Sequence, residues 1–290
     1  MAMIEDSAAS GETPGGLRAD EPARTAAGAD EVRQLWRGAV GTDLPSRVRD
    51  VWDRVGRACA AAGRPRSSVR LLPVSKTHSA ASILAVDRVL DTLATREEVP
   101  AGPAGRRLFG ENHVQEIVAK SAQLAGHDVG LALIGHLQSN KVNAVAGLVE
   151  EFQALDSLKL AAKLDRRLSA LGVSLRVLVE VNTSGEQAKH GVPMAEATAL
   201  CRRLGDFDCL EVAGLMTVAV NSPDRHAVAA CFDRLAGLQT QLRDDAVLDS
   251  SWPELSMGMS GDFELAIAHG ATTVRVGTAL FGPRDYGQGD

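Results

Sequence analysis

The chain has 290 residues, of which 45% are hydrophobic and 23% charged, a composition typical of a globular protein with a large core. Its net charge of −6 and its 3% aromatic content argue against nucleic acid as the main partner, because phosphates attract basic surfaces and bases stack on aromatic rings. No run of 18 apolar residues occurs and the N-terminus lacks the apolar core of a secretory signal, so we expect a cytoplasmic protein that is not embedded in a membrane.

The N-terminal region divides into a tail and a helix. Residues 1–42 are rich in Ala, Gly, Asp, Glu and Thr and have little apolar periodicity, which predicts a flexible tail. Order should begin with LPSRVRDVWDRVGRACAAAGR, where Val48, Val51 and Val55 recur at helical spacing and Gly63 provides a stop.

From residue 69 onward, short apolar runs alternate with amphipathic helical patterns. The expected strands are VRLLPVSK, RRLFGEN, LALIGHLQ, EEFQALD, SLRVLVEVN, CLEVAGLMTV, ELSMGMS and TTVRVGTALFG. Repeated strand-then-helix units with nearly continuous apolar strands indicate a parallel sheet covered by helices. Eight such units predict an α/β fold, a single (β/α)8 TIM barrel with an additional N-terminal helix, and a doubly wound open sheet is the alternative.

Polar residues gather where the predicted strands end, which is where barrel enzymes place their chemistry. They are Lys76, Glu111, Asn112, His136, Gln138, Asp156, Asn182, Thr217, Ser256, Ser260 and Arg275. A lysine at a strand end is either a nucleophile that forms a Schiff base or a structural lysine in a salt bridge. An anion site near Lys76 would favour the first interpretation.

Two late segments are typical of such an anion site. SMGMSGDFE passes from a strand through glycines and Ser260 into a helix start, where backbone N–H groups attract phosphate. VRVGTALFG offers Gly277 and Thr278 at the end of the last strand, and the loops after strands 7 and 8 often bind phosphate in barrels. Opposite a strand-end lysine, they indicate a phosphorylated carbonyl cofactor, pyridoxal 5′-phosphate (PLP).

Seven motifs, in this order, resemble those of the YggS-like PLP homeostasis proteins, which are fold type III barrels like the N-terminal domain of alanine racemase. They are VSKT, FGENHVQE, IGHLQSNK, VNTSGEQAKHG, GLMTV, LSMGMSGDFELAI and VRVGTALFG. The resemblance covers roughly residues 43–286, which implies one PLP-binding barrel over that range and a short C-terminal tail at 287–290. It also implies that Lys76 carries PLP as a Schiff base.

The resemblance implies further cofactor contacts. Ser256, Gly277 and Thr278 match the phosphate-binding positions, and Ser260 lies beside them in the sequence. Arg275 matches an arginine that faces the pyridine nitrogen, and Asn112 matches an asparagine beside the cofactor. His136, at a strand end, and Met216, in GLMTV, complete the residues that we expect at the cofactor.

Two departures from the family pattern stand out. The chain carries additional sequence between Ala94 and Arg106, including the loop signal EEVPAGPAG, which predicts a surface insertion after the first barrel helix. The pocket entrance is therefore expected to differ from the family pattern, whereas Lys76 is not affected. The tail before residue 43 is also additional.

Carrier and enzyme functions remain as alternatives. A guanidinium cannot give up its proton, so Arg275 would leave the pyridine nitrogen unprotonated and the ring a poor electron sink. Racemases of this type bring a catalytic tyrosine from a second β-domain, whereas this chain ends soon after the last strand and its only tyrosine is Tyr286. We therefore expect a monomeric carrier for PLP (vitamin B6) homeostasis that passes PLP to apo-enzymes without robust catalysis. The alternative is a PLP-dependent amino-acid racemase or related lyase.

Other polar residues allow two interpretations each. His113 either supplies acid–base chemistry or is exposed at the surface, and His136 either has a direct role or only lines the pocket. Lys141 and Lys189 either attract phosphate at the rim of the pocket or are solvated surface lysines. The cysteines, Cys59, Cys201, Cys209 and Cys231, follow no ligand or disulfide spacing. We expect reduced thiols and no metal site.

Overall fold

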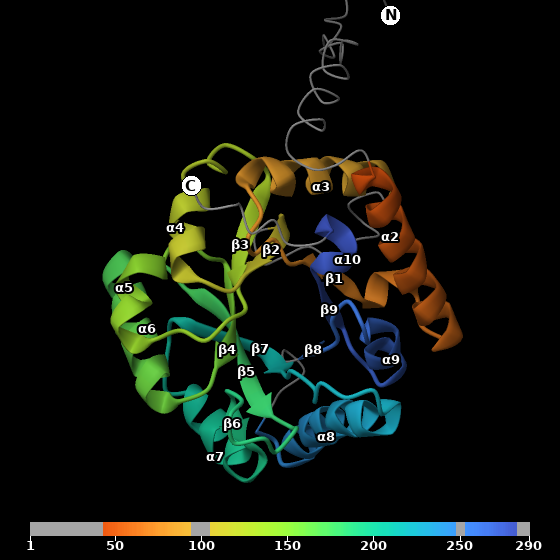
Figure 1. Ribbon diagram of the computed structural model, residues 1–290. Coiled ribbons are helices and arrows are strands. Elements are labelled where there is room, and N and C mark those ends of the chain that lie inside the picture. Colours follow the sequence, from red (N-terminus) through yellow and green to blue (C-terminus); the bar gives the residue numbers. More distant parts are fainter. Residues whose placement is uncertain (1–42, 94–104, 248–252, 283–290) are drawn as a thin grey trace, which may run out of the picture.

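The computed structural model describes residues 43–93, 105–247 and 253–282, and eight parallel strands form its centre (Figure 1). They pair in the order β1-β9-β8-β7-β5-β4-β3-β2, and the short β6 (Val192–Pro193) pairs with β5 outside this path. The strands are β1 (Arg70–Pro73), β2 (Arg107–Glu111), β3 (Val129–Leu133), β4 (Glu151–Leu155), β5 (Leu175–Asn182), β7 (Leu210–Met216), β8 (Glu254–Ser256) and β9 (Thr273–Val276).

The first two strands bring the sheet close to full closure. Val74, just past β1, forms a parallel bridge with Gly110 in β2, and the Ser75 N–H donates to the Gly110 carbonyl at 2.9 Å. The eight strands thus form a nearly closed barrel, which confirms the predicted TIM-barrel fold rather than the open sheet.

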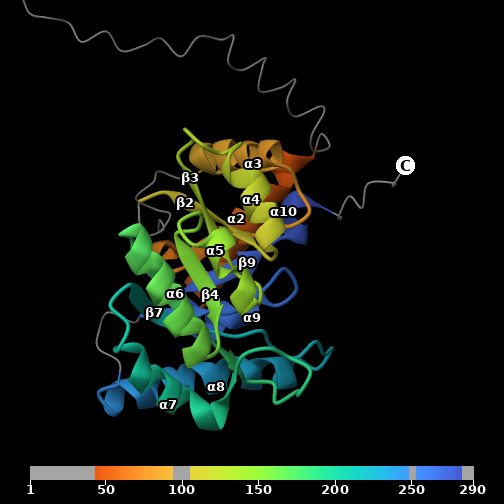
Figure 2. The same cartoon turned by 90° about the vertical axis from the view of Figure 1, so that its left-hand side faces the viewer.

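Helices surround the barrel in chain order, from α3 at the top of Figure 1 through α6 on the left and α8 below to α9 on the right. Seen from the left (Figure 2), α4, α5 and α6 lie across the strands. The helices are α2 (Leu44–Ala61), α3 (Ala80–Leu93), α4 (Val114–Ser121), α5 (Val142–Val145), α6 (Leu158–Leu171), α7 (Met194–Leu204), α8 (Arg225–Asp244), α9 (Phe263–Ala268) and α10 (Thr278–Phe281). Among these described helices, none has the length and apolarity needed to cross a membrane.

The apolar periodicity of each long helix determines the face that it buries. In α6, Leu160, Leu164 and Leu168 recur every four residues and are all buried, whereas the polar Lys159, Arg166 and Ser169 are exposed. The helix ends where Gly172 adopts a left-handed conformation with φ 68°. The additional N-terminal helix, α2, packs in the same way against α3, α9 and α10.

Several predicted strands end earlier than expected. LALIGHLQ is extended only to Leu133, and ELSMGMS only to Ser256, because each run reaches a glycine within two residues of the strand end. TTVRVGTALFG leaves the sheet after Val276, and its last residues form α10. The predicted tails and the insertion after Ala94 fall largely outside the described residues, so the domain boundaries stay predictions.

The barrel interior at the N-terminal ends of the strands holds a buried ion-pair network. Arg70 in β1 donates to both carboxylate oxygens of Glu151 in β4, at 3.0 and 2.8 Å, and Glu151 is fully buried. Arg176 and Glu254 extend the network. Although burial alone would raise the pKa of Glu151, the charge and hydrogen bonds of Arg70 hold it below its usual value.

Replacing Glu151 with glutamine tests this network. Glu151→Gln leaves the buried Arg70 guanidinium without its main counter-charge, so the free energy of unfolding should fall by about 3–5 kcal/mol. Urea denaturation followed by circular dichroism measures the change. The matched control is Glu196→Gln on the exposed face of α7, expected to shift stability by less than about 0.5 kcal/mol. A loss below about 1 kcal/mol in Glu151→Gln would mean that the pair is not a main support of the barrel.

Candidate functional site

A cavity of about 450 Å³ opens at the carboxyl ends of the strands. Its lining residues come from loops and strand ends all around the barrel: Val74, Lys76, His78, Asn112, Ile134, Gly135, His136, Glu180, His190, Val218, Met259, Ser260, Gly261, Arg275, Gly277 and Thr278. Arg275 and Glu180 are buried, whereas His136, His190 and Thr278 are exposed. The strand-end cavity therefore has a charged, water-poor floor and a polar mouth.

Lys76 lies in the turn between β1 and α3, and its neighbours restrain this turn closely. Thr77 adopts φ 66°, a left-handed conformation that is uncommon for a β-branched residue. Its N–H donates to Glu116 Oε2 at 2.7 Å. On the other side of Lys76, the Ser75 hydroxyl donates to Glu111 Oε1 at 2.6 Å. The backbone that carries the lysine is thus anchored on both sides.

Lys120 in α4 connects these anchors. Its buried Nζ donates to the Ser75 carbonyl at 2.9 Å, to Glu111 at 2.7 Å and to Glu116 at 2.9 Å. Burial raises the pKa of Glu111, against the opposing effect of Lys120. For Glu116, burial also acts to raise the pKa, but the hydrogen bonds from Lys120 and the Thr77 backbone hold it below its usual value. We call these three side chains, Glu111, Glu116 and Lys120, the turn anchor.

Arg275 in β9 is held by neutral oxygen atoms at the cavity floor. Its Nη1 donates to Ser256 Oγ and its Nη2 to the Thr217 carbonyl, both at 2.7 Å. Burial lowers the pKa of Arg275 to about 10, partly opposed by the negative charges of Glu180 and Asp262. The guanidinium therefore remains charged at neutral pH inside the barrel.

Glycines let two backbone segments approach the cavity. Gly135 passes so close to the Asn112 carbonyl that a Cβ atom would collide with it. Gly258 has φ 92°, and a Cβ there would lie 2.6 Å from the Cβ of Ala266. The turn that brings Ser260 to the cavity therefore requires glycine at position 258.

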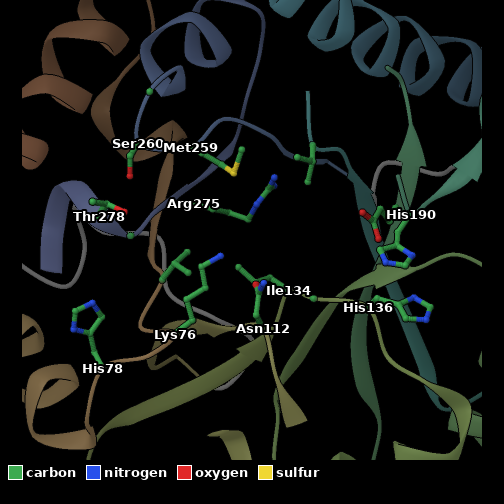
Figure 3. Close-up of a pocket in the computed structure, with 16 residues that line it drawn as sticks. Lys76, His78, Asn112, Ile134, His136, His190, Met259, Ser260, Arg275 and Thr278 are labelled. Atoms are coloured by element: carbon green, nitrogen blue, oxygen red, sulfur yellow. The ribbon is translucent and has the colours of Figure 1, made fainter. Parts of the chain in front are cut away.

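The polar groups of the strand-end cavity occupy two sides (Figure 3). Lys76, Ser260 and Thr278 lie on one side of Arg275, and His136 and His190 lie on the other. The two imidazole rings are stacked, with centroids 4.3 Å apart and planes 7° apart. Glu180, from β5, also lines the cavity.

Most of the predicted cofactor residues meet at this cavity. Those that line it are Lys76, Asn112, His136, Ser260, Arg275, Gly277 and Thr278. Two others are absent from the lining. Ser256 and Met216 are buried at their strand ends, and the Ser256 hydroxyl is occupied by Arg275 and by Gln153 Oε1, at 2.7 Å each.

The remaining sequence candidates lie elsewhere. His113 is exposed at the start of α4, and Lys141 is exposed. Lys189 donates to the Ala219 carbonyl at 2.9 Å and pairs with Glu186 at 3.2 Å. None of these three residues lines the described cavity.

Glu180, His190 and two members of the turn anchor, Glu116 and Lys120, were not predicted from the sequence. A glutamate inside the apolar run LVEVN was the available sign for Glu180, because a charged residue in a buried strand needs a compensating interaction or a function. The role of Lys120 had no comparable sign, since a single lysine on a helix is usually solvated.

The chain is similar to known proteins in both sequence and structure. Residues 69–285 match the family described as alanine racemase, N-terminal domain. The chain is 39% identical to the pyridoxal phosphate homeostasis protein of Vibrio cholerae over 84% of its own length and 97% of that protein. It resembles the structure of PipY from Synechococcus elongatus with PLP bound, at 33% identity and TM-score 0.65, over 79% of this chain and 100% of PipY. A structure from Bifidobacterium adolescentis, described as an unknown protein, is similar at 36% identity and TM-score 0.72, over 82% and 94%.

Removing the central lysine of the turn anchor should loosen the turn that carries Lys76. In Lys120→Met, Glu111 and Glu116 lose their shared counter-charge, so the Thr77 amide should exchange with solvent at least about tenfold faster. Hydrogen–deuterium exchange measures this rate, and Lys159→Met, at an exposed position on α6, is the control. Unchanged protection of Thr77 would show that the turn holds its conformation without Lys120.

Proposed function

Because the chain belongs to the family of pyridoxal phosphate homeostasis proteins, built on the N-terminal domain of alanine racemase, we propose that it binds PLP in the strand-end cavity. In this proposal Lys76 carries PLP as a Schiff base, and the protein stores the cofactor and passes it to apo-enzymes. The observation that carries the proposal is the single cavity that Lys76, two hydroxyl groups and a buried guanidinium share.

The lining chemistry fits the three functional groups of PLP. The side with Ser260 and Thr278 offers hydroxyl groups for the phosphate, and Gly277 leaves space beside them. The amine of Lys76 suits the aldehyde, and Arg275 suits the pyridine nitrogen as a fixed hydrogen-bond donor. Asn112 would contact the ring, which the family resemblance also implies.

Covalent attachment needs only the lysine and the aldehyde. Lys76 would hold the cofactor covalently through Nζ, giving up the two protons of its neutral amine as the aldehyde oxygen is released as water. The turn anchor orients the amine for this reaction through Ser75 and Thr77. When bound, PLP supplies an electron-withdrawing ring, and Arg275 would keep its nitrogen unprotonated and so weaken that effect.

Ser256 and Met216 do not line the cavity, so in this proposal they act on the cofactor only through their neighbours. Ser256 was expected to contact phosphate, but its hydroxyl accepts a hydrogen bond from Arg275, so we assign it the positioning of that guanidinium. Met216 is buried at the end of β7, next to Thr217, whose carbonyl accepts from Arg275. His136 lies at the mouth, away from Lys76.

We further propose that residues 43–286 act as one unit, as a monomer in the cytoplasm. The relatives' shared name supports a role in PLP homeostasis. An amino-acid racemase or lyase stays the alternative, because Glu180, His136 and His190 offer acid–base groups across the cavity from Lys76. Turnover of D- or L-amino acids by the PLP-loaded protein would favour the enzyme, and sedimentation as a dimer would contradict the monomer.

Lys76→Ala should abolish covalent PLP binding without unfolding the barrel. The visible absorbance of the bound cofactor should disappear, and borohydride should trap no PLP on the peptide that contains position 76. Lys159→Ala, an exposed lysine on α6, should behave as the wild type. Trapping of PLP by a correctly folded Lys76→Ala protein would assign the attachment to another lysine.

Arg275→Ala should weaken PLP retention while leaving Lys76 reactive. Loss of a charged hydrogen bond costs about 1.5–3 kcal/mol, so the dissociation constant should rise about 10- to 100-fold. Equilibrium dialysis measures retention, and borohydride trapping at saturating PLP verifies that Lys76 still reacts. An unchanged dissociation constant would remove Arg275 from the proposed site.

A further inference from the structure

Glu180 is a buried carboxylate whose side chain makes no hydrogen bond or ion pair among the described residues. The residue is only 7% exposed, yet it lines the strand-end cavity. Burial raises its pKa to about 7, against the attraction of Arg275 and with a further increase from Asp156. Its carboxyl oxygens are not among the fully enclosed polar atoms, so they face the cavity, where a ligand with hydrogen-bond donors can reach them.

The groups around Glu180 favour a cationic ligand. Arg275 is the nearby positive charge, but its guanidinium donors are directed to Ser256 and the Thr217 carbonyl. The stacked rings of His136 and His190 lie beyond, toward the mouth, and Asp156 Oδ2 lies 3.6 Å from His136 Nδ1. Asp156 thus adds a second carboxylate near Glu180 and the imidazole pair. Lys76 lies on the other side of Arg275 from the two imidazoles.

We propose that Glu180, His136 and His190 form a second binding subsite of the cavity, and that Glu180 receives the primary ammonium group of a small amine there. We call it the amine subsite. An ammonium group supplies the hydrogen-bond donors and the positive charge that Glu180 lacks. The exposed imidazole pair leaves the rest of the amine at the mouth, where it enters from solvent.

The amine subsite adds a second ligand to the proposed function, and this inference rests on the proposal that PLP binds in the same cavity. Lys76 and the hydroxyl groups of Ser260 and Thr278 lie on the opposite side from the imidazoles, so PLP and an amine need not compete for the same lining. An amine held by Glu180 and the imidazole pair would lie on the other side of Arg275 from Lys76. Glu180 would therefore select amines as the compounds that share the cavity with PLP in this protein.

The binding of glycine and of glycolate tests the proposal directly. The two ions have similar size and share a carboxylate, but only glycine has an ammonium group. Titrations of the PLP-free full chain, followed by NMR, should show shifts at Glu180 and its neighbours with glycine, and at least about tenfold weaker binding of glycolate. Glu180→Gln should weaken glycine binding about tenfold or more, whereas Glu196→Gln on α7 should not.

The dependence on pH gives a second, independent readout. The ionised form of Glu180 binds the ammonium group, so glycine should bind up to about tenfold more tightly near pH 8 than near pH 6. This difference should disappear in Glu180→Gln. The other titratable and charged groups on this side and across the cavity are Arg275, Asp156, His136, His190 and Lys76, and they are intact in that variant.

PLP loading of the same proteins separates this inference from the proposed function. If wild type loads PLP but binds glycine no better than glycolate, the amine subsite is wrong and the carrier proposal stands. If glycine binds through Glu180 but PLP does not load, the carrier proposal fails instead. If Glu180→Gln loses PLP and keeps glycine, Glu180 serves the cofactor and the inference is overturned.

Discussion

The fold and the site both depend on one buried chain of hydrogen bonds through the barrel. It runs from Arg70 to Glu151, from there to Gln153 at 2.6 Å, and on through Ser256 to Arg275. Burying these charges is favourable only because each has a partner, so the network requires a specific strand register. The same register sets Arg275 at the cavity floor, so the stability of the barrel and the position of this charge are coupled.

A second network, the turn anchor, acts outside the barrel interior. Lys120 connects the end of β2 to the turn after β1, so the closure of the barrel near Gly110 and the orientation of Lys76 share the same supports. Neither network reaches the Glu180 carboxylate, which makes no hydrogen bond or ion pair with another described side chain and lines the cavity. Positive charge is thus fixed in this cavity, whereas the negative charge can change with pH.

The parts of the structure that depend on local patterns could be predicted from the sequence. Apolar runs and helical periodicity indicated the barrel, and the polar strand ends predicted that Lys76 and Arg275 lie at the same end of it, as they do. Features that depend on contacts between distant segments could not. Ser256 was expected in the pocket, but the register of β8 against its neighbours directs its hydroxyl to Arg275 and Gln153. His190 follows its strand by eight residues, so only the folded loop brings it to His136.

The left-handed backbone of Thr77 restricts the turn that carries Lys76. A residue with a Cβ atom in this region costs about 1–2 kcal/mol, which glycine would avoid. A glycine there would also give the turn more conformations, and the tip of the neighbouring lysine would spread over a larger volume. The chain therefore gives up folding free energy at Thr77 for a turn that narrows the positions open to the neighbouring Lys76 side chain, which is what the proposed attachment of PLP would require.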